Sequence, residues 1–230
     1  MHIVSEPNIL YFGTPIVLIG TTNKDGSYNL APMSSVFWLG WRCMIGLAAP
    51  SKTTQNILRT DECVLNLASI HNVAAVNKLA KTTGSNPVPQ GKQQKGYFFE
   101  PDKFNRAELT ASHADIVDAP LVNECLVQLE AKLIYSRSLA QEDEVMKGRI
   151  ITMELQVIRV HVDDSILADG KTNKIDPNKW KPLIMSFQKF YSLGDEVHAS
   201  TLAEIPEELY KTPDIEKAKH YNESFKEVMA

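Results

Sequence analysis

The segment GTTNKDGSYNLAPMSS, residues 20–35, carries the clearest local signal in the chain. At its centre, Asp25-Gly26 is a dipeptide that favours a tight hairpin turn, because both residue types tolerate positive φ. Residues 14–23 before the turn are rich in β-branched side chains. We therefore expect one strand over residues 14–23 and a second over residues 28–38.

Pro32 limits where the second of these strands can lie. Proline has no N–H to donate to a neighbouring strand, so this strand must lie at a sheet edge or contain a bulge. Further along the chain, short segments of regular period predict more strands and two helices. The expected strands cover residues 42–49 and 62–68, and the expected helices cover residues 52–60 and 71–81.

Two long segments in the second half alternate between apolar and polar residues. Residues 126–138 place Val127, Leu129 and Ala131 on one face, and residues 149–163 repeat the pattern. A period of two predicts half-buried antiparallel strands. Because strands dominate and no strand–helix–strand alternation occurs, we predict a mainly β fold, an antiparallel split or closed β-barrel with a few peripheral helices.

Two regions fall outside the barrel pattern. Residues 82–103 are polar and contain proline and glycine, which predicts a long loop of the kind that is often functional. From about residue 195 the chain becomes charged, with helices expected over residues 201–210 and 212–230. An apolar stripe in the last helix predicts packing on the body or on a partner subunit; it consists of Ile215, Ala218, Tyr221, Phe225 and Val228.

The composition is that of an ordinary globular protein, with 43% hydrophobic residues among 230 and a formal net charge of −4. Nucleic-acid binding needs a basic surface, so the negative net charge argues against it. No apolar run approaches the ~20 residues that span a bilayer. The N-terminus lacks signal-peptide features, and the histidines show no metal-ligand spacing. We expect a cytoplasmic protein without a metal site, without nucleic-acid or membrane binding, and with buried thiols at Cys43, Cys63 and Cys125.

Residues 51–57, SKTTQNI, place hydroxyl groups and a lysine at the start of an expected helix. The first N–H groups of a helix have no intrahelical partner and lie at its positive dipole end, so they favour an anion. Ser51, Thr53 and Thr54 add hydroxyl donors, and Lys52 adds charge. The pattern suits a phosphomonoester, while ordinary N-capping by serine or threonine explains the same residues.

The motif Asn-x-Ala-Pro-x-Ser at residues 29–34, followed by the Lys-Thr-Thr-x-Asn turn at residues 52–56, resembles the flavin reductase-like, FMN-binding split-barrel family. The resemblance extends over about residues 14–194. It implies an FMN-binding split-barrel domain over residues 1–194, followed by a helical C-terminal extension over residues 195–230. It also implies FMN as the cofactor and a homodimer.

The resemblance implies cofactor-binding roles for residues of both motifs. Small side chains and backbone amides of the first would hold the flavin ring, and the second would hold the phosphate. A polar edge strand with a kinked turn is the alternative interpretation of the first motif. The predicted cofactor-binding residues are Asn29, Ala31, Pro32, Ser34, Ser35, Ser51, Lys52, Thr53, Thr54 and Asn56.

Secondary candidates and departures from the family pattern concern the surroundings of the ring. Thr82, Thr83 and Lys92 are secondary candidates from the long loop, and Phe187 is a candidate for covering the ring. The chain has Ser35 where family members often carry an aromatic residue, and WLGWR at residues 38–42 replaces a common Pro-Pro turn. One edge of the flavin is therefore expected to have an unusual environment.

The leading functional hypothesis is a reductase in which electrons pass from NAD(P)H through bound FMN to free flavin, to another small molecule or to a protein. No catalytic side chain is assigned, because the chemistry resides in the cofactor. One alternative is an FMN electron carrier with little NAD(P)H turnover. Another is a split-barrel binding protein for haem or for a different phosphorylated ligand, such as pyridoxal phosphate.

Overall fold

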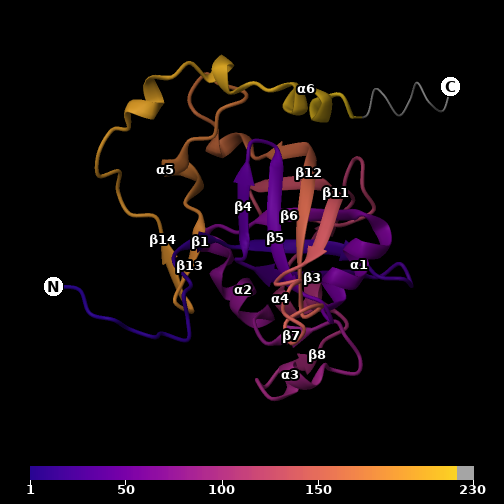
Figure 1. Ribbon diagram of the computed structural model, residues 1–230. Helices are drawn as coiled ribbons and strands as arrows, with labels where there is room; N and C mark the ends of the chain where they lie inside the picture. Colours follow the sequence, from indigo (N-terminus) through magenta and orange to yellow (C-terminus); the bar gives the residue numbers. More distant parts are fainter. Residues whose placement is uncertain (222–230) are drawn as a thin grey trace.

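The computed structural model describes residues 1–221, and its centre is one antiparallel sheet of seven strands. These strands are β2 (Val17–Thr22), β3 (Tyr28–Met33), β4 (Val36–Leu39), β5 (Arg42–Ala48), β6 (Glu62–Leu67), β11 (Val127–Ser138) and β12 (Ile150–Val162). Their order is β3-β2-β6-β11-β12-β5-β4, so the consecutive strands β3 and β4 form opposite edges. The sheet curls so that β4, β5 and β12 cross over β2 and β3 (Figure 1), which confirms the predicted split barrel.

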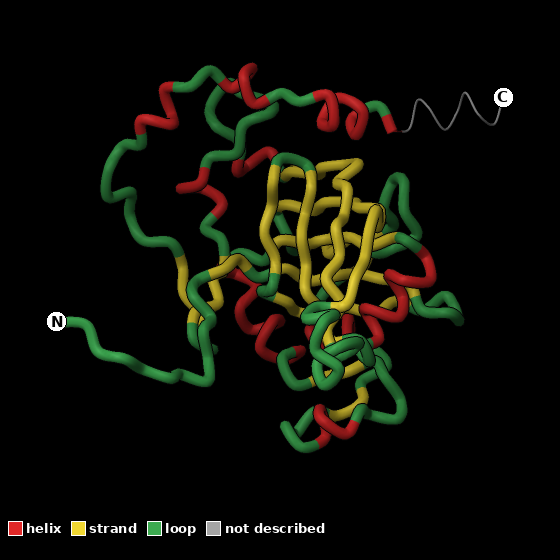
Figure 2. The backbone as a smooth tube through the Cα atoms, in the orientation of Figure 1, coloured by secondary structure: helices red, strands yellow, loops and turns green. Residues whose placement is uncertain are grey.

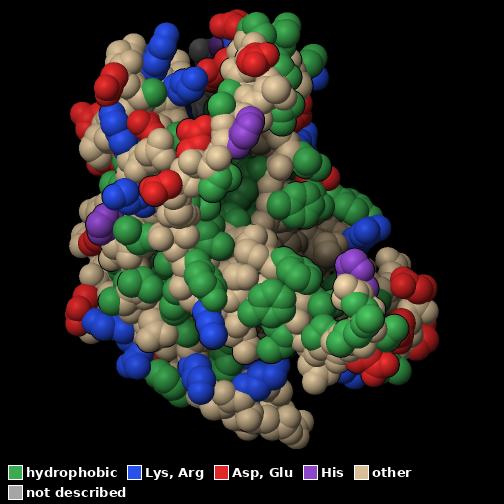
Figure 3. Space-filling model, turned by 90° about the vertical axis from the view of Figure 1, so that its left-hand side faces the viewer, with side chains coloured by type: hydrophobic (Ala, Val, Ile, Leu, Met, Phe, Trp, Pro, Cys, Tyr) green, Lys and Arg blue, Asp and Glu red, His purple; other side chains and the backbone are tan. Residues whose placement is uncertain are grey.

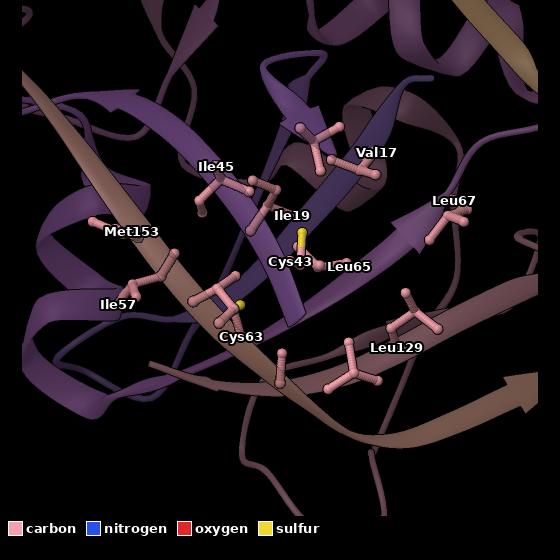
Figure 4. Close-up of a cluster of buried hydrophobic side chains, with 14 of the residues drawn as sticks. Val17, Ile19, Cys43, Ile45, Ile57, Cys63, Leu65, Leu67, Leu129 and Met153 are labelled. Atoms are coloured by element: carbon pink, nitrogen blue, oxygen red, sulfur yellow. The ribbon is translucent and has the colours of Figure 1, made fainter. Parts of the chain in front are cut away.

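The barrel interior holds the main hydrophobic cluster. Figure 4 shows Ile19, Leu65 and Leu129 pointing toward one another from different strands. Burial of each such side chain contributes roughly 1.5–3 kcal/mol, so the alternating strands are fixed in register by their apolar faces. Cys43 and Cys63 belong to this cluster and, like the third cysteine, are buried and unpaired, as expected.

Shorter elements surround the barrel, and Figure 2 shows helices and loops around the strands. A small sheet has the order β1-β13-β14. The helices are α1 (Lys52–Thr60), α2 (Val73–Leu79), α3 (Gln90–Gln93), α4 (Lys103–Ala107), α5 (Pro177–Trp180) and α6 (Pro213–Lys219). The short strands are β1 (Thr14–Pro15), β7 (Thr82–Thr83), β8 (Phe98–Phe99), β9 (Ala111–Ser112), β10 (Leu121–Val122), β13 (Leu183–Ser186) and β14 (Lys189–Ser192), and the 3₁₀ turns are η1 (Ile70–Asn72), η2 (Asp164–Ile166), η3 (Thr201–Glu204) and η4 (Glu207–Tyr210).

Three expectations about local structure need correction. The strand expected over residues 28–38 is two strands, β3 and β4, because the chain passes from one edge of the sheet to the other between them. The loop expected over residues 82–103 contains β7, α3 and β8. The helix expected over residues 201–210 is replaced by η3 and η4, because Pro206 between them lacks an N–H and disfavours helical geometry at the residue before it.

The tail returns to the barrel at α6. Arg42 on β5 binds Asp214 through two hydrogen bonds of 2.5 and 3.0 Å, and Ile215 is buried near Gly40. The apolar stripe thus packs on the body of the same chain, and two of its predicted members, Phe225 and Val228, lie outside the described residues. Among residues 1–221, no helix has the length and hydropathy needed to cross a membrane.

Candidate functional site

The edge strand β3 places the first motif. β3 is hydrogen-bonded only to β2, so Pro32 lies in an edge strand as predicted, opposite Leu18. Side chains alternate along a strand, so Ala31 projects to the same face as Asn29, which reaches α1. Ser34 and Ser35 then link β3 to β4. Within the described residues, β3 has a neighbouring strand of the sheet on one side only, and Ala31 is its one small side chain.

The start of α1 places the second motif. Ser51 is the N-cap, and its Oγ accepts a hydrogen bond from the Thr54 N–H at 3.1 Å. The Thr54 hydroxyl donates to the Ala48 carbonyl oxygen at 2.9 Å and is fully buried. These two hydroxyls therefore stabilise the helix end itself. The half-buried Lys52 and the remaining first-turn N–H groups are the donors that stay available to an anion.

A buried network of amides and hydroxyls joins α1 to the β2–β3 hairpin. The Asn29 amide donates to Thr21 Oγ1 and to Thr53 Oγ1, each at 3.1 Å. The Asn56 amide donates to the same Thr21 oxygen at 3.1 Å and to Asn23 Oδ1 at 2.9 Å. Thr53 accepts in this network and keeps its own hydroxyl proton. Three predicted site residues thus fix the hairpin against the helix.

A cavity of about 410 Å³ opens between the hairpin turn, the start of α1 and the loop that follows β7. Its wall includes Asn29, Lys52 and Gly84. A Cβ at Gly84 would lie 2.6 Å from Asn29 Oδ1 and 3.1 Å from Lys52 Cγ, so only glycine permits this approach. The loop is also held to the helix start by the Ser85 hydroxyl, which donates to the Pro50 carbonyl oxygen at 3.0 Å.

Two further lysines donate hydrogen bonds to residues in the cavity wall or next to it in the chain. Lys103 at the start of α4 is 3% exposed, and its Nζ donates to Asn29 Oδ1 at 3.1 Å. Burial, together with repulsion from Lys92, lowers the pKa of Lys103 to about 7, although Glu100 acts in the opposite direction. The Lys92 ammonium donates to Thr83 Oγ1 at 3.3 Å, and burial lowers its pKa as well.

The structure brings most of the predicted site residues together. Asn29 of the first motif meets the second motif where β3 contacts α1, and the secondary candidates Thr83 and Lys92 lie at the adjoining loop. Ser34 and Ser35 lie beyond the other end of β3, where the Ser35 carbonyl oxygen accepts from the Gly46 N–H on β5. Phe187 lies elsewhere, on the turn between β13 and β14, with its ring 5.2 Å from that of Phe12. The sequence reasoning missed Gly84 and Lys103; a glycine in a polar loop was the available signal for the first, and nothing local distinguished the second.

The sequence also gave no sign of a cluster formed by Asp115, Glu130 and His161, whose ligand atoms lie within 4.8 Å of one another. Glu130 is fully buried, and its carboxylate accepts hydrogen bonds from the N–H groups of residues 115–117 and from His161 Nε2. Burial raises the pKa of Glu130, but these hydrogen bonds outweigh burial and lower it. Both oxygens are engaged, so the arrangement anchors the loop to the sheet.

Taken together, the structure shows a split barrel with a polar cavity at the β2–β3 hairpin and the start of α1, and both lysines and carboxylates belong to the cavity wall. The chain belongs to the flavin reductase like domain family, whose model matches residues 9–194. This membership confirms the family to which the two motifs pointed.

The chain is also similar to individual proteins. It is 33% identical over 192 residues to the uncharacterized protein YdfE of Bacillus subtilis, covering 84% of this chain and 89% of that protein. Flavoredoxin of Desulfovibrio vulgaris (Miyazaki F) matches with a TM-score of 0.71 at 22% identity, over 89% of this chain and 100% of that one. Nitrilotriacetate monooxygenase component B from Bacillus cereus matches with a TM-score of 0.66 at 19% identity, over 84% and 89%.

Proposed function

We propose that this protein binds FMN and transfers electrons from NAD(P)H, through the bound flavin, to free flavin or to another acceptor. The observation that carries the proposal is the position of the cavity at Lys52. In this chain, a member of the family, the cavity lies between the start of α1 and the β2–β3 hairpin, and the edge strand β3 continues from that hairpin. An elongated ligand with a planar ring and a terminal phosphate matches these two surfaces.

The residues present fit FMN. Lys52 and the first-turn N–H groups of α1 offer charge and donors for a phosphomonoester. Ala31, Ser34 and Ser35 offer backbone groups and small side chains where the ring would lie along β3. Bound FMN supplies the capacity to accept and release hydride, while the protein holds and orients it. No side chain needs to act as a general acid or base in this scheme.

The direct test is the visible spectrum of the purified protein, before and after incubation with FMN and removal of the excess. We expect flavin absorption bands, FMN as the released chromophore, and bleaching when NADH or NADPH is added anaerobically. Lys52→Met should weaken FMN binding by about tenfold, the equivalent of ~1.4 kcal/mol. Lys95→Met, which alters an exposed lysine in the same loop region, is the matched control.

The result that would refute the proposal is the absence of flavin bands together with no uptake of added FMN. The spectrum of bound haem or of pyridoxal phosphate would then support the alternative binding function. Bound FMN that nicotinamide reduces only slowly, and that a redox partner reduces quickly, would assign the protein as an electron carrier.

We also propose that the protein acts as a homodimer. The N-terminal arm and the β13–β14 hairpin expose large apolar side chains, and Figure 3 shows hydrophobic groups around a hollow on this side of the molecule. Contiguous exposed apolar surface is typical of protein contacts; the side chains are Leu10, Tyr11, Phe12, Phe187, Tyr191 and Leu193. Sedimentation equilibrium should give twice the chain mass at micromolar concentration, and a monomer would refute the proposal.

A further inference from the structure

The segment between β14 and α6, residues 195–211, lies entirely on the surface, and we call it the strap. Every residue in it is exposed, and among the described residues its backbone hydrogen bonds have both partners inside the strap. The strap begins directly after residue 194, where the match to the family model ends. Neither the barrel core nor the family domain therefore accounts for its sequence.

The strap is nevertheless fixed at both ends. Before it, β14 belongs to the small sheet β1-β13-β14. After it, α6 docks on the barrel, where Asp214 pairs with Arg42 on β5 and both Ile215 and Ala218 are buried. Figure 1 shows the chain between these two anchors as an arc on the outside of the molecule. The side chains of the strap are thus presented to solvent from a segment whose two ends are held.

Negative charge is concentrated in the strap. It contains five acidic residues and one lysine, a formal charge of −4, which equals the formal net charge of the whole chain. Positive and negative side chains therefore balance over the rest of the protein. Among the described residues, none of the five carboxylates accepts a hydrogen bond or forms an ion pair; they belong to Asp195, Glu196, Glu204, Glu207 and Glu208.

The strap also exposes large apolar side chains. Val197 is 98% exposed, and Leu202 on η3 and Leu209 on η4 are 65% and 74% exposed. Exposed apolar groups that are bordered by charged residues are typical of protein interaction sites. Anionic membranes and nucleic acids would repel the strap. A second copy of this chain is a poor match, because its own strap is equally negative and the rest of it has no excess of positive charge.

We propose that the strap is a docking site for a partner protein whose contact face has a basic rim and an apolar centre. The carboxylates steer such a partner toward the strap and select it against acidic proteins. The apolar side chains supply surface that is buried when the two proteins associate. Docking of this kind does not require bound flavin, so it is open to test whether or not FMN binds.

The experiment is calorimetric titration of the full-length protein with horse-heart cytochrome c, a basic protein with an exposed apolar patch, at low and at physiological ionic strength. We expect binding that weakens as salt rises, because salt screens surface charges. Changing the five strap carboxylates to amides should lower the affinity by about tenfold. The matched control has the same net charge and should stay close to wild type; it changes five exposed carboxylates outside the strap, in Glu6→Gln, Asp61→Asn, Asp118→Asn, Glu142→Gln and Asp164→Asn.

A second strap variant, Leu202→Ser with Leu209→Ser, tests the apolar contribution. It should weaken binding of cytochrome c while the salt dependence stays that of wild type, because its charges are unchanged. No binding at low salt, equal losses in the amide variant and its control, or wild-type affinity in either strap variant would overturn the proposal. If the strap variants alter only the sedimentation equilibrium of the protein itself, the strap contacts a second copy of the chain and the proposal is wrong.

Discussion

Replacing Gly84 with alanine tests how tightly the loop after β7 is pressed against the site. The new Cβ would lie 2.6 Å from Asn29 Oδ1, and 3.1 and 3.2 Å from two carbon atoms of Lys52. A separation below 3.0 Å forces one partner to move. Gly84 does not have positive φ, so alanine causes no backbone strain, and the whole effect is steric.

The expected loss in the free energy of unfolding depends on which contacting group moves. Asn29 cannot rotate freely, because its amide donates to two threonine hydroxyls. If Asn29 moves, the hydrogen bond from the Lys103 ammonium is lost, at a cost of about 1.5–3 kcal/mol. If the loop retreats instead, the bond from Ser85 to Pro50 is lost, at a cost of about 1 kcal/mol. We expect the free energy of unfolding to fall by about 1–3 kcal/mol.

Thermal unfolding followed by circular dichroism measures the loss of stability. For a domain of this size, about 1–3 kcal/mol corresponds to a fall in melting temperature of roughly 2–12 °C. We expect FMN affinity to fall by at least tenfold as well, because the cavity wall is displaced. Gly91→Ala is the matched control: a Cβ there meets nothing within 4 Å, and alanine favours the short helix α3. Equal melting temperatures and FMN affinities for the two variants would refute the reasoning.

The other predictions concern positions away from the cavity. Glu130→Gln should lower the free energy of unfolding at pH 7 by about 3 kcal/mol, since it leaves buried donors facing a neutral amide. Because the pKa of Glu130 is lowered in the folded state, the stability that its carboxylate contributes is present above pH ~4.5 and is lost as the pH falls below that value. A pH series of melting temperatures in which variant and wild type do not converge in acid would contradict this prediction. Gly20→Ala places a Cβ 2.4 Å from the Pro120 carbonyl oxygen and should destabilise the fold by about 3 kcal/mol in urea titrations, while the remaining folded protein keeps its flavin affinity. Asp214→Asn breaks a partly exposed pair with Arg42 and should cost no more than about 1 kcal/mol, with the difference from wild type shrinking in high salt.

The candidate site was predictable in part. The two motifs suggested that residues near Asn29 and residues near Ser51 share one function, and the structure joins them through the Thr53 hydroxyl. The sequence also suggested that serine and threonine hydroxyls face an anion, whereas those of Ser51 and Thr54 bond within the helix end. Local pattern cannot distinguish a hydroxyl that caps a helix from one that also binds a ligand, because both occupy the same positions.

What the sequence alone established is local. The Asp-Gly pair predicted the hairpin, residues 52–60 form the helix expected there, and period-two alternation predicted the two long strands. Each of these elements depends on residues that are close together in the sequence, because turn preference, helix capping and alternating polarity are properties of neighbouring residue types. Contacts between segments that are distant in the sequence were not predictable in this way. Lys103 contacts Asn29, 74 residues away in the chain, and Glu130 binds the loop at residues 115–117. The order of the strands brings these segments together. That order depends on packing between segments, which no single segment encodes.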